Sequence, residues 1–287
     1  MKIIDIYKKN SLVFSVEFSP PKDKNGKKKI FEIFKALKKF PIKYFSLTCG
    51  ALGSKERDII EIGLLLKKKY QLEVLLHLIG RNKPKKDIEN FLIKMKKRKL
   101  QNILALRGDL KIDKKEKDCY FQGIKYAFEI VRQIKQNQGG YFCVGVAGYP
   151  EGHPECPDFE KNLEYLKIKV QCGADFVISQ AFLDVEKFLK FRESALKKGI
   201  KIPIVAGVFL LNKISDVKFL SQFLKISVPK KLKEKMKTKK DDKEEIKKIF
   251  EEFNFSLVEK LIKEEVCGIH FFTMNRLKPT LKIFEKL

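Results

Sequence analysis

Short apolar runs alternate with amphipathic stretches along almost the whole chain. The apolar runs are rich in β-branched and aromatic residues and predict strands over 13–18, 44–48, 73–78, 102–106, 142–147, 175–180, 202–208 and 268–273. Between them, apolar residues recur at helical spacing and predict helices over 27–39, 56–69, 86–97, 121–136, 159–172, 184–197 and 213–224. Eight strand–helix alternations without a break in composition favour an α/β fold of the (β/α)8 TIM barrel type. An open, doubly wound sheet is the alternative architecture.

The last alternation is longer than the others. Residues 229–248 are rich in lysine and acidic residues, and apolar residues follow at helical spacing from Ile249 to Ile262. We therefore expect extra helices between strands seven and eight: an exposed helix, a polar turn and a packed helix. A chain of 287 residues holds a barrel of roughly 250 residues with such additions. We expect a single catalytic domain over 1–287.

The excess of basic residues raises the question of an anionic partner. The chain has 62 Lys and Arg against 36 Asp and Glu, a formal net charge of +26. Such an excess is typical of proteins with anionic partners, nucleic acid among them. Here the lysines are spread over the whole chain and do not gather in one aromatic-rich stripe, which favours solvated helix faces over a nucleic-acid groove. A basic nucleic-acid-binding barrel stays as an alternative.

Cysteine usage and hydropathy suggest a compartment. None of the six cysteines forms a C-x-x-C pair, which argues against a zinc site or a disulfide framework and suits a reducing environment. The N-terminal residues lack the apolar core of a signal peptide. No apolar run approaches the ~20 residues that a membrane span needs. We expect a cytoplasmic protein that has no membrane partner.

Polar residues stand at the carboxyl ends of successive predicted strands, where parallel α/β proteins bind their ligands. These residues are Glu17, Thr48, His77, Asp109, Tyr149 and Gln180. The series predicts an enzyme site at a barrel mouth. The three histidines have no metal-ligand spacing, so no metal is predicted. Taken alone, His77 on its apolar strand is more typical of a core residue than of a ligand-binding one.

Glu17 is the first candidate for catalysis. The two-residue period of a strand puts Ser15 and Glu17 on one face and Phe14, Val16 and Phe18 on the other. Helices cover the outside of a barrel, so Glu17 should point into it near the mouth. Poor solvation there would raise the pKa of the carboxyl group, as suits a general acid. The alternative is a structural Glu paired with Lys or Arg.

Two further segments carry candidate chemistry. Arg107, Gly108 and Asp109 directly follow a short apolar strand, and Asp109 is either a solvated loop residue or a carboxylate that accepts paired N–H donors from a heterocycle. Residues 147–155 form a Gly- and Pro-rich loop with Tyr149 and His153. The helix that follows carries Lys167 and Lys169, and such an arrangement can hold phosphate.

Seven segments occur in the order and at the spacing of one known family. They are Val16-Glu-Phe-Ser-Pro-Pro21, Ser46-Leu-Thr48, Ala105-Leu-Arg-Gly-Asp109, Tyr149-Pro-Glu-Gly-His-Pro154, Leu166-Lys-Ile-Lys-Val170, Gly173-Ala-Asp-Phe-Val-Ile-Ser-Gln180 and His270-Phe-Phe-Thr-Met-Asn-Arg276. Together they resemble methylenetetrahydrofolate reductase, in its short bacterial form. The resemblance implies a TIM barrel flavoprotein with FAD at the carboxyl ends of the strands. It also implies reduction of 5,10-methylenetetrahydrofolate to 5-methyltetrahydrofolate for methionine biosynthesis, with electrons from NADH or NADPH in a ping-pong sequence, and a homo-oligomer.

The resemblance also assigns roles to residues. Glu17 matches the general acid that helps to open the methylene bridge, and Asp109 matches a residue that binds the pterin and the flavin. Gln180 and Arg276 match substrate-binding residues. The matching FAD-contacting positions are Thr48, His77, Arg107, Tyr120, Tyr149, His153 and Lys169.

Some positions depart from the family pattern. The family often has Pro-Gly-Ile-x-Pro after strand seven, where this chain reads Ala206-Gly-Val-Phe-Leu210. Asp216 and Leu220 stand where some bacterial members have a Gln and a Phe that contact nicotinamide and folate. Cys49 and Ile168 replace a Tyr and a flavin-phosphate Arg. These departures leave open a related flavoprotein that takes electrons from a partner protein.

Overall fold

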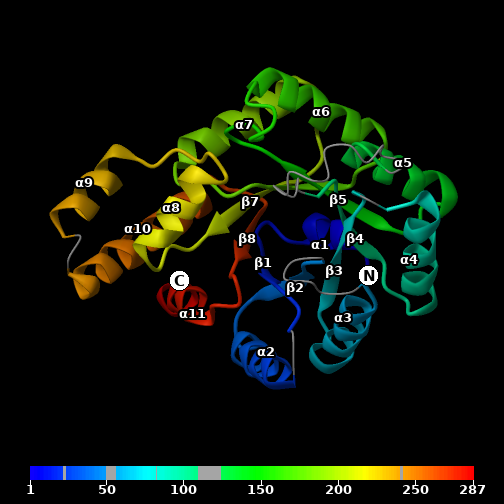
Figure 1. The fold of residues 1–287 in the computed structure, drawn as a ribbon, viewed down its shortest axis with the longest axis horizontal. Helices are drawn as coiled ribbons and strands as arrows, with labels where there is room; N and C mark the ends of the chain where they lie inside the picture. Colours follow the sequence, from blue (N-terminus) through cyan, green and yellow to red (C-terminus); the bar gives the residue numbers. More distant parts are fainter. Residues whose placement is uncertain (22–23, 50–55, 82, 109–123, 240–241) are drawn as a thin grey trace, which may run out of the picture.

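A computed structural model describes residues 1–21, 24–49, 56–81, 83–108, 124–239 and 242–287. Eight parallel strands form a closed barrel in sequential order, and β1 pairs with both β2 and β8 (Figure 1). The strands are β1 Val13–Phe18, β2 Ile42–Leu47, β3 Glu73–Ile79, β4 Asn102–Leu106, β5 Cys143–Gly148, β6 Phe176–Ser179, β7 Ile204–Phe209 and β8 Gly268–Phe272. The predicted TIM barrel is confirmed, and the open doubly wound sheet was the wrong alternative.

Helices follow the strands and surround the barrel. They are α2 Lys24–Leu37, α3 Glu56–Tyr70, α4 Lys85–Lys97, α5 Ala127–Asn137, α6 Phe159–Gln171, α7 Val185–Lys197, α8 Ile214–Gln222, α9 Lys230–Thr238, α10 Lys243–Lys263 and α11 Leu277–Lys286. The extra helices α9 and α10 confirm the expectation for the segment between strands seven and eight. Residues 121–123 of the predicted helix over 121–136 lie outside the described residues. Helix α5 begins at Ala127, because Tyr126 has an extended backbone and the Glu129 side chain accepts its backbone N–H at 2.8 Å.

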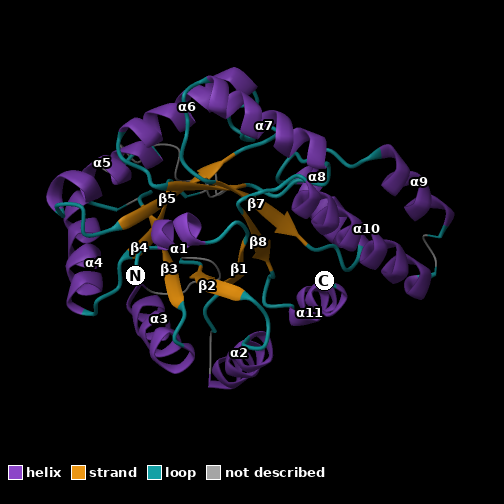
Figure 2. Cartoon of the chain, turned by 180° about the vertical axis from the view of Figure 1, so that it is seen from behind, coloured by secondary structure: helices purple, strands orange, loops and turns teal. Residues whose placement is uncertain are grey.

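A short helix that the sequence pattern did not predict, α1 Ile3–Lys9, lies across one end of the barrel (Figures 1 and 2). Its apolar side chains pack against strand residues that include Val13, Cys143 and Phe176, each the first residue of its strand. The whole cluster contains Ile3, Ile6, Tyr7, Val13, Tyr44, Leu75, Leu104, Cys143, Phe176, Ile178 and Val205. The hydroxyl groups of Tyr7 and Tyr44 are 2.8 Å apart inside this cluster. Helix α1 therefore covers the amino-terminal end of the barrel and leaves the carboxyl end for a site.

The two faces of β1 divide as the strand period predicts. Phe14, Val16 and Phe18 are buried against the surrounding helices, and the ring of Phe18 lies 4.7 Å from that of Phe34 on α2. Ser15 and Glu17 point into the barrel, where both contact side chains of other strands. Apolar contacts with the helices thus orient the polar face of β1 toward the interior.

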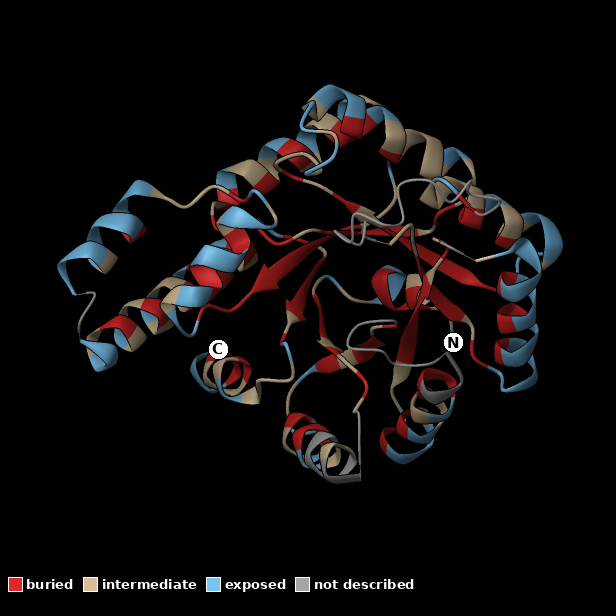
Figure 3. Ribbon diagram, viewed as in Figure 1, coloured by how far each residue is buried: buried red, intermediate tan, exposed pale blue. Residues whose placement is uncertain are grey.

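Helices α9 and α10 extend from the barrel on the side of α8 (Figure 1). Much of the surface of α9 is exposed (Figure 3), and Leu232 is its buried residue. Helix α10 is anchored by buried residues along its length, among them Phe250, Leu257 and Leu261. Among the helices that the structure describes, none combines the length and the apolar character that crossing a bilayer requires.

Candidate active site

A sharp turn ends β4 and opens the site. The backbone N–H of Arg81 donates to the carbonyl of Arg107 at 2.8 Å, and Gly108 follows with φ +94°. A Cβ at Gly108 would lie 2.5 Å from Cγ2 of Ile79, so both the backbone angle and the space require glycine. The predicted site residues Asp109 and Tyr120 lie outside the described residues.

Glu17 meets two histidines inside the barrel mouth. Its Oε2 lies 3.3 Å from Nε2 of His77 on β3 and 3.5 Å from Nε2 of His270 on β8. Each histidine is held by a serine: Ser46 Oγ is 2.8 Å from Nε2 of His77, and Ser15 Oγ is 2.8 Å from Nδ1 of His270. Four strands and their hydrogen bonds therefore fix the position of one carboxylate.

This arrangement corrects the sequence-based expectation for the pKa of Glu17. Burial acts to raise this pKa, as expected, but the hydrogen bond with His270 and the charges of His77 and His270 outweigh burial, so the pKa is lowered. Burial in turn lowers the pKa of His77 to about 4. The carboxyl group is ionised at neutral pH. Its partners are histidines, whereas the sequence suggested Lys or Arg as the alternative to catalysis.

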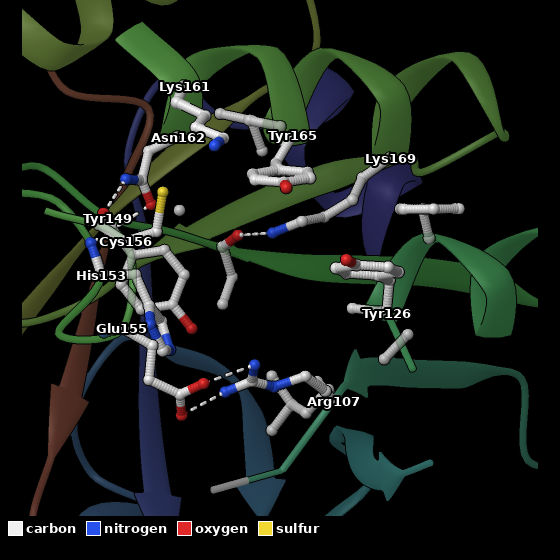
Figure 4. A pocket seen from close by; sticks show the side chains of 17 residues that line it. Arg107, Tyr126, Tyr149, His153, Glu155, Cys156, Lys161, Asn162, Tyr165 and Lys169 are labelled. Atoms are coloured by element: carbon white, nitrogen blue, oxygen red, sulfur yellow. Dashed lines mark hydrogen bonds and ion pairs between the residues drawn. The ribbon is translucent and has the colours of Figure 1, made fainter. Parts of the chain in front are cut away.

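At the carboxyl end of the barrel, a cavity of about 310 Å³ opens between the ends of β4 and β5 and the helices α5 and α6 (Figure 4). Four predicted cofactor-binding residues line it: Arg107, Tyr149, His153 and Lys169. The rings of Tyr149 and His153 meet edge to face at 4.7 Å. The structure therefore brings together residues that stand up to 62 positions apart in the sequence (169 − 107).

Lys169 is a partly buried cation within this cavity. Its Nζ donates to the backbone carbonyl of Ala147 at 2.7 Å and lies 5.7 Å from the centre of the Tyr149 ring. Burial lowers the pKa of Lys169 to about 8, and the nearby charge of Arg107 adds to this effect. In the described part of the chain, no carboxylate forms an ion pair with Lys169. An anionic ligand group would stabilise this charge, which no carboxylate of the described residues pairs with.

Arg107 has a carboxylate partner at the edge of the same cavity. Both of its terminal nitrogens donate to Glu155, which follows the predicted loop residues His153 and Pro154 (Figure 4). The hydrogen bond from Arg107 lowers the pKa of Glu155, and the Arg107 charge adds to this effect. Glu155 was not among the predicted site residues.

Two tyrosines of the cavity also escaped prediction. The rings of Tyr126 and Tyr165 stack at 5.8 Å, with an interplanar angle of 21°, across the gap between α5 and α6. Neither residue belongs to a short sequence motif. Which way their side chains point depends on how α5 and α6 pack in the assembled barrel, and the sequence pattern does not reveal this. His270 was predicted as part of a family segment but not as a partner of Glu17. The inward alternation of Gly268, His270 and Phe272 is the signal that could have identified it.

The remaining predicted residues lie elsewhere around the mouth. Thr48 follows β2 and donates its hydroxyl to Ser19 Oγ at 3.2 Å. Gln180 follows β6, and its side-chain oxygen accepts the N–H of Ala181 at 2.9 Å. Arg276 follows β8 and is paired with Asp216. Neither Thr48 nor His77 lines the cavity described above. Among the described residues, no group of three or more His, Cys, Asp or Glu could hold a metal ion.

Comparison with known proteins relates the whole chain to one family. The family model described as methylenetetrahydrofolate reductase matches residues 2–287. A methylenetetrahydrofolate reductase (NADH) of Arabidopsis thaliana is 30% identical over 303 aligned positions, which cover 100% of this chain and 51% of the relative. A 5,10-methylenetetrahydrofolate reductase of Buchnera aphidicola is 29% identical, with 91% of this chain and 87% of the relative covered. The chain thus spans about half the length of the plant relative.

A solved structure supports the fold. A protein from Clostridium thermocellum, described as binding two copies of 5-methyl-5,6,7,8-tetrahydrofolic acid, superposes with a TM-score of 0.65. The match covers 99% of this chain and 96% of that protein, at 15% sequence identity. At this identity the likeness shows a shared barrel.

Proposed function

The chain belongs to the methylenetetrahydrofolate reductase family, and on this premise we propose that it reduces 5,10-methylenetetrahydrofolate to 5-methyltetrahydrofolate with FAD as cofactor and NADH or NADPH as electron donor. The observation that carries the proposal is the position of Glu17, which two histidines hold inside the barrel mouth on the same side as the cationic cavity. We propose that the chain forms one catalytic domain and that copies of this domain assemble into a homo-oligomer.

The cavity fits the anionic part of FAD. Lys169 and Arg107 supply two cationic groups, and the partly buried ammonium of Lys169 has no carboxylate partner among the described residues. Tyr126, Tyr149 and Tyr165 line the same cavity and give it aromatic side chains that suit a flat group. When bound, FAD would carry hydride between nicotinamide and folate. Thr48, His77 and His153 complete the proposed cofactor-binding residues in the described part of the chain, and Tyr120 and Asp109 belong to the same proposal.

Glu17 is the proposed general acid. It would donate a proton to a nitrogen of the methylene bridge while the carbon–nitrogen bond breaks, and the resulting iminium carbon would accept hydride. The carboxyl group is ionised at neutral pH, so it must gain a proton as the folate binds. A pterin seated above Glu17 would exclude water from the carboxyl group, and this adds to the desolvation that acts to raise its pKa. Gln180 and Asp109 are proposed to hold the pterin, and Arg276 the far end of the substrate.

An absorbance spectrum followed by anaerobic addition of NADH tests the proposal. Flavin bands that bleach with NADH and recover on addition of 5,10-methylenetetrahydrofolate are the expected result. A protein that neither contains nor takes up FAD would overturn it.

A second candidate differs in the electron donor. Asp216 and Leu220 replace residues that contact nicotinamide in some bacterial members, and both are buried here. A related flavoprotein that accepts electrons from a protein would show flavin bands that resist NADH and NADPH and yield to dithionite. Rapid reduction by either nucleotide excludes it.

A further inference from the structure

An ion pair joins the loops that follow the last two strands of the barrel. Nη1 of Arg276, directly before α11, lies 3.0 Å from Oδ1 and 2.8 Å from Oδ2 of Asp216, in the first turn of α8. The Asp216 side chain is only 7% exposed, whereas that of Arg276 is 27% exposed. The pair therefore has a buried acidic side and a guanidinium that ligands can reach.

The carboxylate of Asp216 is held by the backbone as well. Its Oδ2 accepts the N–H groups of Asn212 at 2.9 Å and of Lys213 at 3.2 Å, so it satisfies donors at the start of α8. These bonds fix the carboxylate independently of Arg276. Asp216 is thus a rigid anchor for the guanidinium group.

A ring and a tethered loop restrict Arg276 further. The guanidinium carbon lies 5.5 Å from the centre of the Phe209 ring at the end of β7. The hydroxyl of Thr273 donates to the carbonyl of Glu17, and the Asn275 side chain accepts the N–H of Ser19 at 2.9 Å and donates to its carbonyl at 3.0 Å. The loop that carries Arg276 is therefore tied to the loop after β1, next to Glu17.

This geometry leaves part of the guanidinium for a ligand. Among the described residues, the polar contacts of the Arg276 side chain all use Nη1, so the donors on Nε and Nη2 stay available. Because Asp216 offsets the charge of Arg276, the pair offers oriented N–H donors and little net charge. Oriented donors of this kind suit amide and carboxylate oxygens at a set distance from Glu17.

We infer that Asp216 is a positioning residue, which holds Arg276 so that its free donors bind oxygen atoms of the aminobenzoyl-glutamate part of the folate. The inference rests on the proposed function. It assigns a role to a position where the chain departs from the family pattern. Asp216 does not touch the substrate and acts through Arg276.

The test combines Asp216→Asn, Arg276→Met and the double variant. Asn retains an oxygen that accepts the backbone N–H groups, but it loses the charge that holds the guanidinium. We expect Asp216→Asn to raise KM for 5,10-methylenetetrahydrofolate by about tenfold, with kcat and the rate of flavin reduction by NADH changed less than about twofold. Arg276→Met should raise KM at least as much, and the double variant should be no worse than Arg276→Met.

Asp184→Asn is a matched control. Asp184 caps α7 by accepting the N–H of Glu186 at 3.1 Å, with no arginine among its contacts in the described structure. This control should leave KM unchanged. Effects of Asp216→Asn and Arg276→Met that add fully in the double variant would overturn the inference, because Asp216 would then act only on α8. An unchanged KM in Asp216→Asn would overturn it as well.

Calorimetric binding of 5-methyltetrahydrofolate separates this inference from the proposed function. If the wild-type protein binds this folate but does not turn over, the proposed reaction fails, and the inference is decided by the Kd. A Kd raised about tenfold in Asp216→Asn supports the inference, and an unchanged Kd overturns it. Absence of folate binding by the wild-type protein would overturn both.

Discussion

Arg107 and Glu155 form a two-point ion pair at the edge of the cavity, with Nη1–Oε2 and Nη2–Oε1 distances of 2.9 and 2.7 Å. In the proposed complex, Glu155 therefore competes with the FAD phosphates for Arg107. Glu155→Gln should tighten FAD binding several-fold, because it frees the guanidinium and removes a negative charge beside the phosphates. Fluorescence titration of the apoprotein measures the Kd. Glu164→Gln, which removes a charge of α6 paired with Lys198 outside the cavity, should change it little. Weaker binding in Glu155→Gln would contradict competition.

Lys169 should make FAD binding depend on pH. The pKa of this group is lowered to about 8 by burial and by Arg107, and only the protonated form attracts phosphate. The Kd for FAD should therefore be flat below pH 8 and rise about tenfold per pH unit above it. Lys169→Arg keeps the charge at high pH, so titration of this variant should show no such rise. An identical pH dependence in both proteins would contradict the assignment.

Glu17→Gln should separate the two half-reactions. The amide cannot donate the proton that opens the methylene bridge, so reoxidation of reduced flavin by 5,10-methylenetetrahydrofolate should slow by about 10²- to 10⁴-fold. Flavin reduction by NADH should stay within a few-fold of wild type. Stopped-flow absorbance follows each step. Loss of both steps in a folded variant with full FAD content would refute the proposed role of Glu17.

His77 should make the fold less stable in mild acid. Burial lowers its folded-state pKa to about 4, whereas the unfolded chain binds the proton near pH 6.5. Between these values the unfolded state holds more protons, so stability falls as pH falls from 6.5 toward 4. The loss attributable to His77 between pH 7 and pH 5 is about 2 kcal/mol. Urea unfolding at both pH values measures it, and His77→Asn should show a smaller loss. The lowered pKa of Glu17 acts at lower pH and does not obscure this window.

Helix α1 should contribute to stability and not to catalysis. Ile6 is 3% exposed within the cluster at the amino-terminal end of the barrel. Ile6→Ala should lower the free energy of unfolding by about 2–5 kcal/mol, while kcat of the folded enzyme stays close to wild type. Lys8→Ala on the exposed side of α1 is the control and should alter neither quantity. A large loss of kcat in folded Ile6→Ala would show that packing at the amino-terminal end of the barrel affects the site at the carboxyl end.

Local pattern predicted those parts of the fold that depend on neighbouring residues. The strand period of Phe14 to Phe18 gave the inward direction of Glu17, since it follows from backbone geometry alone. The bounds of β1 and β4 agree with prediction for the same reason. Helix α1 was missed because seven residues are too few for helical spacing to stand out.

Contacts between distant segments were beyond prediction. The pKa of Glu17 depends on His77 and His270, which reach it from strands 60 and 253 positions away (77 − 17 and 270 − 17). The pairing of Arg107 with Glu155 and of Arg276 with Asp216 likewise needs the relative positions of two loops. Roles for Asp109 and Tyr120 stay predictions, since both lie outside the described residues.

The closure of the barrel also sets an order of events during folding. Strand β1 pairs with β8, and the hydrogen bond between Ser15 and His270 joins residues 255 positions apart. One edge of β1 therefore stays unpaired until β8 is made, and β8 leaves the ribosome only after the long insertion of α9 and α10. Until then this edge can pair with other chains, so newly made protein should be most prone to aggregate just before β8 emerges. The contacts of Glu17 with His270 form in that final step, and chains that stop before β8 should lack activity even when most of the barrel has formed.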